Sequence, residues 1–138
     1  VIVQTYNPEH YCIQTVITGH EEEFYKKELS LRLETNYPPF YTLARIGFSG
    51  ISRDDVIEES QAFALCLAEL KSPNSEILGP APAAIERIKG RTRWHILIKA
   101  PAERPMRTWL TNAIRAYRKK KRKSEIRWMV DINPYSMM

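Results

Sequence analysis

The 138-residue sequence contains 21 Lys and Arg, 16 Asp and Glu, and 43% hydrophobic residues, including three Trp, seven Tyr and four Phe. This apolar content is enough to form a core, which argues against a wholly disordered chain. No apolar run approaches the roughly 18–20 residues that cross a bilayer, and we recognise no signal peptide, so we expect no membrane partner.

Charge is unevenly distributed along the sequence. Residues 85–127 carry 15 Lys and Arg against three Asp and Glu, a net charge of +12, whereas the other residues have a net charge of −7. The commonest partner of such a concentrated positive field is a phosphate backbone. A solubilising surface that ends in a basic helix is the alternative that the charge count leaves open.

The two cysteines, Cys12 and Cys66, lie far apart and have no partner ligands at metal spacing. We interpret them as reduced thiols, which predicts a cytoplasmic protein. Cys66 is expected on the buried face of a helix.

The first 40 residues are predicted to form a strand and a helix outside the main domain. Residues 1–6 alternate in the manner of a strand, and residues 21–34 favour helix, with three glutamates in the first turn. The chain begins inside the predicted strand, so we expect a fragment of a longer polypeptide. The run Tyr37-Pro38-Pro39-Phe40 excludes helix, which places the domain boundary there and gives domains 1–40 and 41–138.

Residues 41–138 alternate regularly between strand and helix patterns. Strands are predicted at 41–48, 76–78, 85–88, 93–99 and 126–132, with the turn of a hairpin at 89–92. Helices are predicted to follow a capping box at Ser52 and to start again near Pro105. This order predicts an α+β fold of the split βαβ type, in which two helices cover one face of an antiparallel sheet. The other face is then free to bind a partner.

Arrangements typical of catalysis are missing from the sequence. It has no Gly-rich phosphate loop, no paired histidines at metal spacing and no Ser or Cys nucleophile motif. His95 lies in a predicted strand, where a single histidine is more often a surface or hydrogen-bonded residue than a catalyst. We therefore expect no enzymatic activity, metal or cofactor in this fragment.

The predicted hairpin is the most informative candidate site. Basic residues occupy every second position, so their charges are expected to project from one strand face, with Ile88 on the other: Arg87, Lys89, Arg91 and Arg93. Together with Lys99, these cations would contact phosphates, and the indole of Trp94 could stack on a base. The alternative is that Trp94 packs in the core and the charges are only solvated.

A second basic run lies near the end of the last predicted helix. Residues 118–123 are six consecutive cations, more than the helix dipole needs at a C-terminus. They would attract phosphate over a long range without reading sequence. The residues expected to take part are Arg115, Arg118, Lys119 and Arg122.

Several motifs in a fixed order resemble the C-terminal end of the primosomal protein N′ family, the bacterial replication-restart helicases called PriA. The motifs are VQTYNPEH at 3–10, YPPF at 37–40, LGPAPA at 78–83, GRTRW at 90–94 and WMVDINP at 128–134. The closing Asp-Ile-Asn-Pro departs slightly from the Asp-Val-Asp-Pro that is usual in the family. The likeness covers nearly the whole sequence.

The resemblance implies that residues 1–40 are the tail of the second helicase lobe. Residues 41–138 would be the C-terminal domain, whose fold in the family is similar to ribosomal protein S10. The family enzyme is an ATP-dependent 3′→5′ DNA helicase that recognises stalled forks and starts primosome assembly. Its ATP and Mg site and its zinc-binding cysteines would lie upstream, outside this sequence.

The resemblance also implies partners, namely single-stranded or forked DNA, other primosome proteins and the acidic C-terminal tail of single-stranded DNA-binding protein. In the family an Arg near the start of the last helix contributes to the pocket for that tail, and Arg104 or Arg107 corresponds to it. A DNA-binding accessory domain and an interaction module that braces the helicase and captures the tail are thus two alternatives. An S10-like RNA-binding protein is a third.

Overall fold

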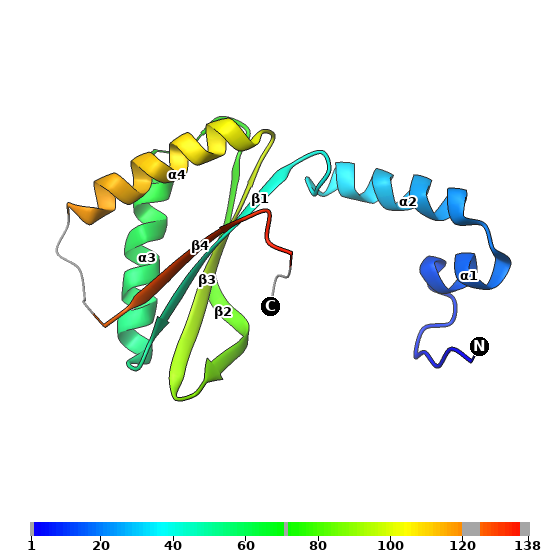
Figure 1. The fold of residues 1–138 in the computed structure, drawn as a ribbon, viewed down its shortest axis with the longest axis horizontal. Coiled ribbons are helices and arrows are strands. Elements are labelled where there is room, and N and C mark those ends of the chain that lie inside the picture. Colours follow the sequence, from blue (N-terminus) through cyan, green and yellow to red (C-terminus); the bar gives the residue numbers. More distant parts are fainter. Residues whose placement is uncertain (1, 71, 120–124, 136–138) are drawn as a thin grey trace. The chain divides into compact units, whose positions relative to one another are not determined.

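The computed structural model describes residues 2–70, 72–119 and 125–135 (Figure 1). By their contacts, residues 1–35 and residues 36–138 form two compact units. Among the described helices, none combines the length and the apolar character that a membrane span requires.

The first unit contains two helices, α1 (Tyr11–Thr18) and α2 (Glu21–Glu34). His10 Nδ1 accepts a hydrogen bond from the Cys12 N–H at the start of α1, and Gly19, with φ of +72°, ends it. The helix at 21–34 is confirmed, whereas α1 was not predicted. The strand prediction at 1–6 is wrong for residues 2–6, because alternation does not supply the neighbouring strand that a ladder of hydrogen bonds needs.

The second unit is a four-stranded antiparallel sheet covered by two helices. Its strands are β1 (Thr42–Gly50), β2 (Glu76–Ile88), β3 (Arg91–Ala100) and β4 (Arg127–Ile132), in the order β2-β3-β1-β4. Helices α3 (Arg53–Glu69) and α4 (Glu103–Arg118) lie on the same side of the sheet (Figure 1). The predicted α+β class, with two helices on one face of an antiparallel sheet, is confirmed.

Alternate residues of the strands form the core between the sheet and the helices. Ala44, Ile46 and Phe48 of β1 are at most 1% exposed, and Cys66 of α3 is buried as predicted. Four aromatic rings with centroids 4.8–6.0 Å apart join both helices to β1 and β4: Phe48, Phe63, Tyr117 and Trp128. Because successive side chains of a strand point to opposite faces, the residues of β1 between these three lie on the other face of the sheet.

The edge strand β2 is longer than predicted. The sequence predicts two short strands separated by Gly79-Pro80-Ala81-Pro82, but one strand runs through this segment, with register shifts on both sides of Ala81 and Pro82. Gly79 has φ of +98°, and a Cβ there would lie 2.9 Å from the His95 carbonyl oxygen. Gly79 therefore lets β2 bulge and continue, and the prolines are tolerated because β2 is an edge strand.

Two residues, Lys89 and Gly90, form the turn between β2 and β3. Both have positive φ, +49° and +76°, which is the backbone of a type I′ hairpin turn. The turn is shorter than the predicted 89–92, so β3 already begins at Arg91. Ile88 consequently lies directly opposite Arg91.

Candidate nucleic-acid interface

The sheet face opposite α3 and α4, here called the open face, carries more cations than carboxylates. The registers place odd-numbered residues of β1, β3 and β4 on this face, because the even-numbered ones point into the core. Its basic residues are Arg45, Arg91, Arg93, Lys99 and Arg127. Asp131, in register with Arg45, and Glu76, in register with Lys99, are its acidic neighbours.

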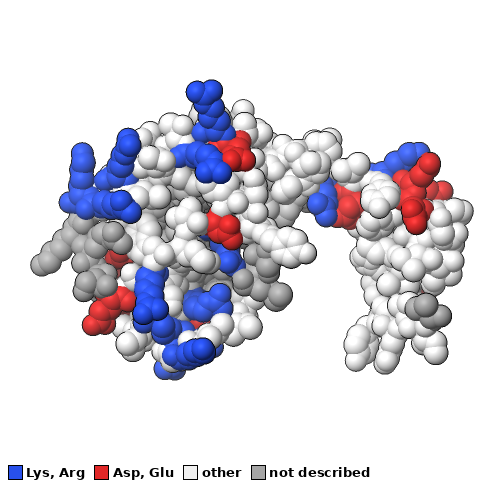
Figure 2. Space-filling view, in the orientation of Figure 1, with Lys and Arg blue, Asp and Glu red and all other residues white. Residues whose placement is uncertain are grey.

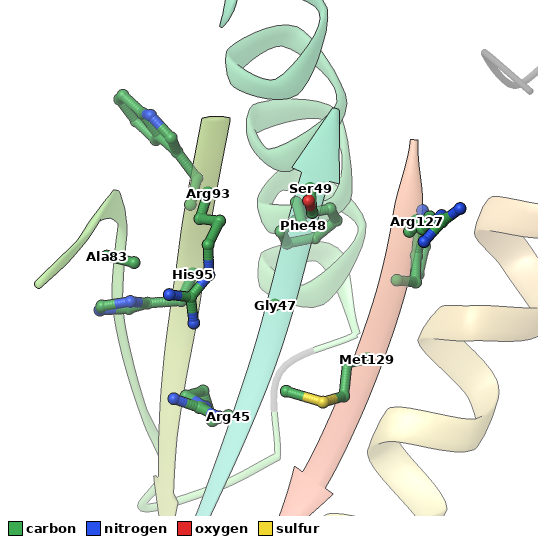
Figure 3. Close-up of a pocket in the computed structure, with 11 residues that line it drawn as sticks. Arg45, Gly47, Phe48, Ser49, Ala83, Arg93, His95, Arg127 and Met129 are labelled. Carbon is green, nitrogen blue, oxygen red and sulfur yellow. The ribbon is translucent and has the colours of Figure 1, made fainter. Parts of the chain in front are cut away.

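A shallow hollow of about 170 Å³ lies in the middle of the open face (Figure 3). Gly47 is in register with His95 on one side and Met129 on the other, and it has no side chain to fill the space between them. Figure 3 shows the Met129 side chain extending from β4 toward β1. The lining residues that the structure describes include Arg45, Arg93 and Arg127 but no carboxylate.

Two arginines flank the hollow from opposite sides of β1. Arg93 on β3 and Arg127 on β4 are both in register with Ser49, so their backbones are two strand spacings, or about 10 Å, apart. Neither guanidinium makes a hydrogen bond or an ion pair with a described residue. Their side chains are long enough to reach one anion placed above Ser49 and Gly47.

The partly buried imidazole of His95 lies beside the hollow. Burial first, and then the positive charges of Arg45 and Arg93, hold the pKa of His95 below its usual value. In Figure 3 the Arg93 side chain reaches along β3 toward His95, and Arg45 lies beyond it on β1. After burial, the second cause is the positive potential of the two arginines, which favours an anion.

The hairpin register corrects the prediction that its cations share one strand face. Arg87 is in register with Thr92, a residue that is only 5% exposed, so Arg87 lies on the face opposite Arg91 and Arg93. Lys89 is in the turn, and Ile88 shares the face of Arg91. The physical reason is the two-residue turn, which pairs odd positions of one strand with even positions of the other.

Arg91 lies on the open face but is engaged with the backbone. Its Nε donates to Ser49 Oγ at 3.1 Å, and its Nη2 donates to the Ser49 carbonyl at 2.7 Å and to the Glu125 carbonyl at 3.2 Å. These bonds tie the end of β1 to the segment that leads into β4. Arg91 therefore braces the sheet beside the hollow.

Lys99 is also engaged within the domain. It is 7% exposed, and its Nζ lies 3.7 Å from Glu76 Oε2 and 4.1 Å from the centre of the Tyr37 ring. The ammonium is thus held by a carboxylate and an aromatic face. Lys99 is therefore not expected to contact phosphate.

Trp94 packs against the core and is no stacking platform on the open face. It is in register with Phe48, on the helix side of the sheet. The guanidinium carbon of Arg53 lies 6.0 Å from its ring centroid, and Arg53 Nε lies 3.1 Å from Glu86 Oε1. Of the two interpretations of Trp94, packing in the core is confirmed.

The basic residues of α4 form a separate charged area. Arg115, Arg118 and Lys119 are exposed, and Arg122 lies outside the described residues. Figure 2 shows basic side chains gathered near the outer end of α4 and again near the β2–β3 hairpin. Since α4 covers the other face of the sheet, its charges do not line the hollow.

The structure distinguishes the two arginines at the start of α4. Arg107 Nε donates to Glu103 Oε1 at 2.6 Å, and Glu103 Oε2 accepts a bond from Asn133 Nδ2. The guanidinium of Arg104 makes no hydrogen bond or ion pair with a described residue, and Arg104 lines an open groove of about 520 Å³. The groove also contains Leu70, Ser72, Pro73, Pro105, Thr108, Trp109 and Asn112.

The hollow was missed in the sequence, although its signal is there. Once Ala44, Ile46 and Phe48 are assigned to the core, Arg45 and Gly47 must face the other way. The pairing of β4 beside β1 is what brings Arg127 next to them. That pairing depends on the strand order, which the sequence does not state.

Comparison with known proteins gives consistent similarities. Residues 33–135 match the model of a family described as the primosomal protein N C-terminal domain. The chain is 34% identical over all 138 residues to the replication restart protein PriA of Bacillus subtilis, covering 17% of that protein. It is 42% identical over 102 residues, 74% of the chain, to the PriA of Synechocystis, covering 12% of it.

The chain thus spans about one sixth or less of the length of these relatives. Among solved structures, the de novo designed protein Foldit4 aligns with 66% of this chain and 96% of its own, at a TM-score of 0.47 and 12% identity. That likeness is too distant to bear on function.

Proposed function

Because the chain belongs to the primosomal protein N C-terminal domain family, we propose that residues 36–138 are a DNA-binding accessory domain of a replication-restart protein. The domain binds the backbone of single-stranded DNA through the open face of its sheet and has no catalysis of its own. Binding is non-specific, because phosphates are the contacted groups.

The observation that carries this proposal is the convergence of arginines from three strands on the open face. Arg45, Arg93 and Arg127 surround a floor without a side chain, and no carboxylate is among the described lining residues. A positively charged groove is the arrangement that tracks the backbone of a single strand of nucleic acid. Arg115, Arg118 and Lys119 on α4 add long-range attraction.

A titration of the 138-residue chain with a fluorescent oligothymidylate, repeated over a range of salt concentrations, tests the proposal. The double variant Arg93→Glu/Arg127→Glu is expected to weaken binding by about a hundredfold and to flatten the salt dependence, because two phosphate contacts are lost.

The matched control removes the same charge from the other area of the domain, in Arg115→Glu/Arg118→Glu. Its affinity for the oligothymidylate is expected to fall only about tenfold, since these residues attract DNA at a distance. If the control weakens binding and the open-face variant leaves it unchanged, DNA binds along α4 and the open-face proposal fails.

A second function is favoured by the state of Arg104. We infer that the groove beside it takes the acidic C-terminal tail of single-stranded DNA-binding protein, with Arg104 pairing a carboxylate. Arg107 is already paired with Glu103 and is less suited to that role. The apolar side chains of Leu70, Pro73 and Trp109 offer the tail a hydrophobic wall.

The pair Arg104→Glu and Arg107→Glu tests this second function with equal changes of charge. Arg104→Glu should lower the affinity for a labelled peptide of the acidic tail by about tenfold, and Arg107→Glu should lower it by less than about threefold. Equal losses for the two variants would contradict the assignment to Arg104.

For the parent protein we propose the ATP-dependent 3′→5′ helicase activity, fork recognition, primosome assembly and bacterial cytoplasmic location that the family resemblance implies. ATP, Mg and zinc would be bound by parts of the parent outside these 138 residues. The relatives' length, six to eight times that of the aligned segment, supports such additional parts.

A further inference from the structure

We propose that the hollow above Gly47 is a subsite for one phosphodiester group of a single DNA strand, held by Arg93 and Arg127 and kept open by the absent side chain of residue 47. This inference rests on the proposed function and adds to it a defined place where the strand sits. It assigns a binding role to Gly47, which carries no charge.

The first argument is the position of Gly47 in the sheet. It is the residue of β1 that lies between His95 and Met129, at the centre of the open face. Its φ is outside the left-handed region, and a Cβ built on it would be in ordinary contact with Met129 Cε at 3.8 Å. Neither turn geometry nor crowding therefore requires glycine here.

A glycine inside a strand weakens the strand and often marks a place where a ligand approaches the backbone closely. Gly50, at the end of the same strand, is different. A Cβ on Gly50 would lie 2.4 Å from Ile126 Cδ1, so core packing accounts for that glycine. Gly47 has no such structural reason, and the hollow above it supplies a functional one.

The second argument is electrostatic. Arg93 and Arg127 are in register with Ser49 on the two strands that flank β1, and neither guanidinium is paired with a described residue. Guanidinium groups bind phosphate oxygens through two parallel N–H bonds, and two guanidiniums can hold the two free oxygens of one phosphodiester. The volume of about 170 Å³ is roughly that of five or six waters, enough for the phosphate and part of its sugar.

The Met129 thioether and the imidazole of His95 complete the walls of the hollow. Met129 offers an apolar surface to the sugar, and the Arg45 charge lies nearby on β1. A free carboxylate of a peptide could in principle meet the same arginines, and the experiment separates the two ligands.

The test fills the hollow without changing any charge. Gly47→Val places two methyl groups where the phosphate would sit, and Gly47→Ala places none beyond a Cβ. The matched control is Ala84→Val, which adds the same groups to an exposed position of β2 outside the hollow. Each variant of the 138-residue chain is titrated with a fluorescent oligothymidylate, and its thermal unfolding is recorded.

We expect Gly47→Val to bind about tenfold more weakly, with a log–log salt slope shallower by about 0.7, the value of one single-strand phosphate contact. The affinity of Gly47→Ala should fall by a smaller factor, and Ala84→Val should bind the oligothymidylate as the wild type does. Gly47→Val should unfold at no lower temperature than the wild type, which separates a filled site from a damaged fold.

The possible failures are distinguishable. If the wild type binds the oligothymidylate and Gly47→Val binds it equally well, the subsite is overturned while the proposed function stands. If the wild type binds no oligothymidylate, both are overturned. If Gly47→Val binds the oligothymidylate as the wild type does but binds an acidic peptide more weakly, the hollow is a peptide site and the phosphate assignment is overturned.

Discussion

The two faces of the same four strands differ in composition and in what their residues do. On β1, Ala44, Ile46 and Phe48 are almost completely buried beneath α3 and α4. The residues between them, Arg45 and Gly47, belong to the open face. A single strand therefore supports the core at every second position and the hollow at the others.

Within the open face, a further difference separates arginines that hold the sheet from arginines available to a ligand. Arg91 uses its guanidinium on the backbone of Ser49 and Glu125. Arg93, two residues later on the same face, makes no such bond with the described residues. Charge alone does not distinguish the two, and only the pairing of the strands does.

The largest effect is expected from truncating the core face. Phe48→Ala should reduce the free energy of unfolding by about 3–5 kcal/mol, because Phe48 is 1% exposed and packs on the rings of Phe63 and Trp128. Met129→Ala on the open face should cost less than about 1 kcal/mol, since Met129 is 49% exposed. Urea denaturation of both variants measures the difference, and equal losses would mean that the open face is packed as well.

A smaller effect should separate the two arginines of β3. Arg91→Ala is expected to lower the free energy of unfolding by about 1–2 kcal/mol, because it leaves two backbone carbonyls without their donor. Arg93→Ala should change stability by less than about 0.5 kcal/mol but weaken DNA binding. Denaturation and DNA titration on the same samples measure both quantities. A variant Arg93→Ala as unstable as Arg91→Ala would show that Arg93 is also structural.

Much of the fold follows from the sequence, because its signals are local. The alternation of Ala44, Ile46 and Phe48 and the cap at Ser52, whose Oγ accepts from Asp55 N–H at 3.3 Å, each depend on a few neighbouring residues. What the sequence does not contain is the turn length at Lys89-Gly90. Because that turn has an even number of residues, Arg87 pairs with Thr92 and lies on the face opposite Arg91 and Arg93.

The candidate site shows the same limit more strongly. The sequence directs attention to the dense basic hairpin, whereas the hollow combines Arg45, Arg93 and Arg127, which are separated by up to 82 positions. Their meeting depends on β1 lying between β3 and β4. Strand order depends on packing between distant parts of the chain, so a local sequence pattern cannot predict it.

The smallest expected effect concerns pH. Burial and the charges of Arg45 and Arg93 hold the pKa of His95 below its usual 6.5, while its neighbours on β2, Ala81 and Ala83, are uncharged. A phosphate in the hollow would offset the two arginine charges and raise this pKa, so the bound state takes up protons more readily. DNA affinity should then rise as pH falls, by about threefold between about pH 7.5 and about pH 6.

A fall in pH has the opposite effect on the stability of the fold, because the pKa of His95 is lowered in the folded state. Because the unfolded chain binds the proton more readily, the stability contributed by neutral His95 is fully present above pH 6.5 and is lost as the pH falls below it. The titration therefore stays at or above about pH 6. His95→Gln is the control, and it should bind DNA with the same affinity across this range. A rise in affinity that persists in His95→Gln would assign the pH dependence to another group and remove His95 from the site.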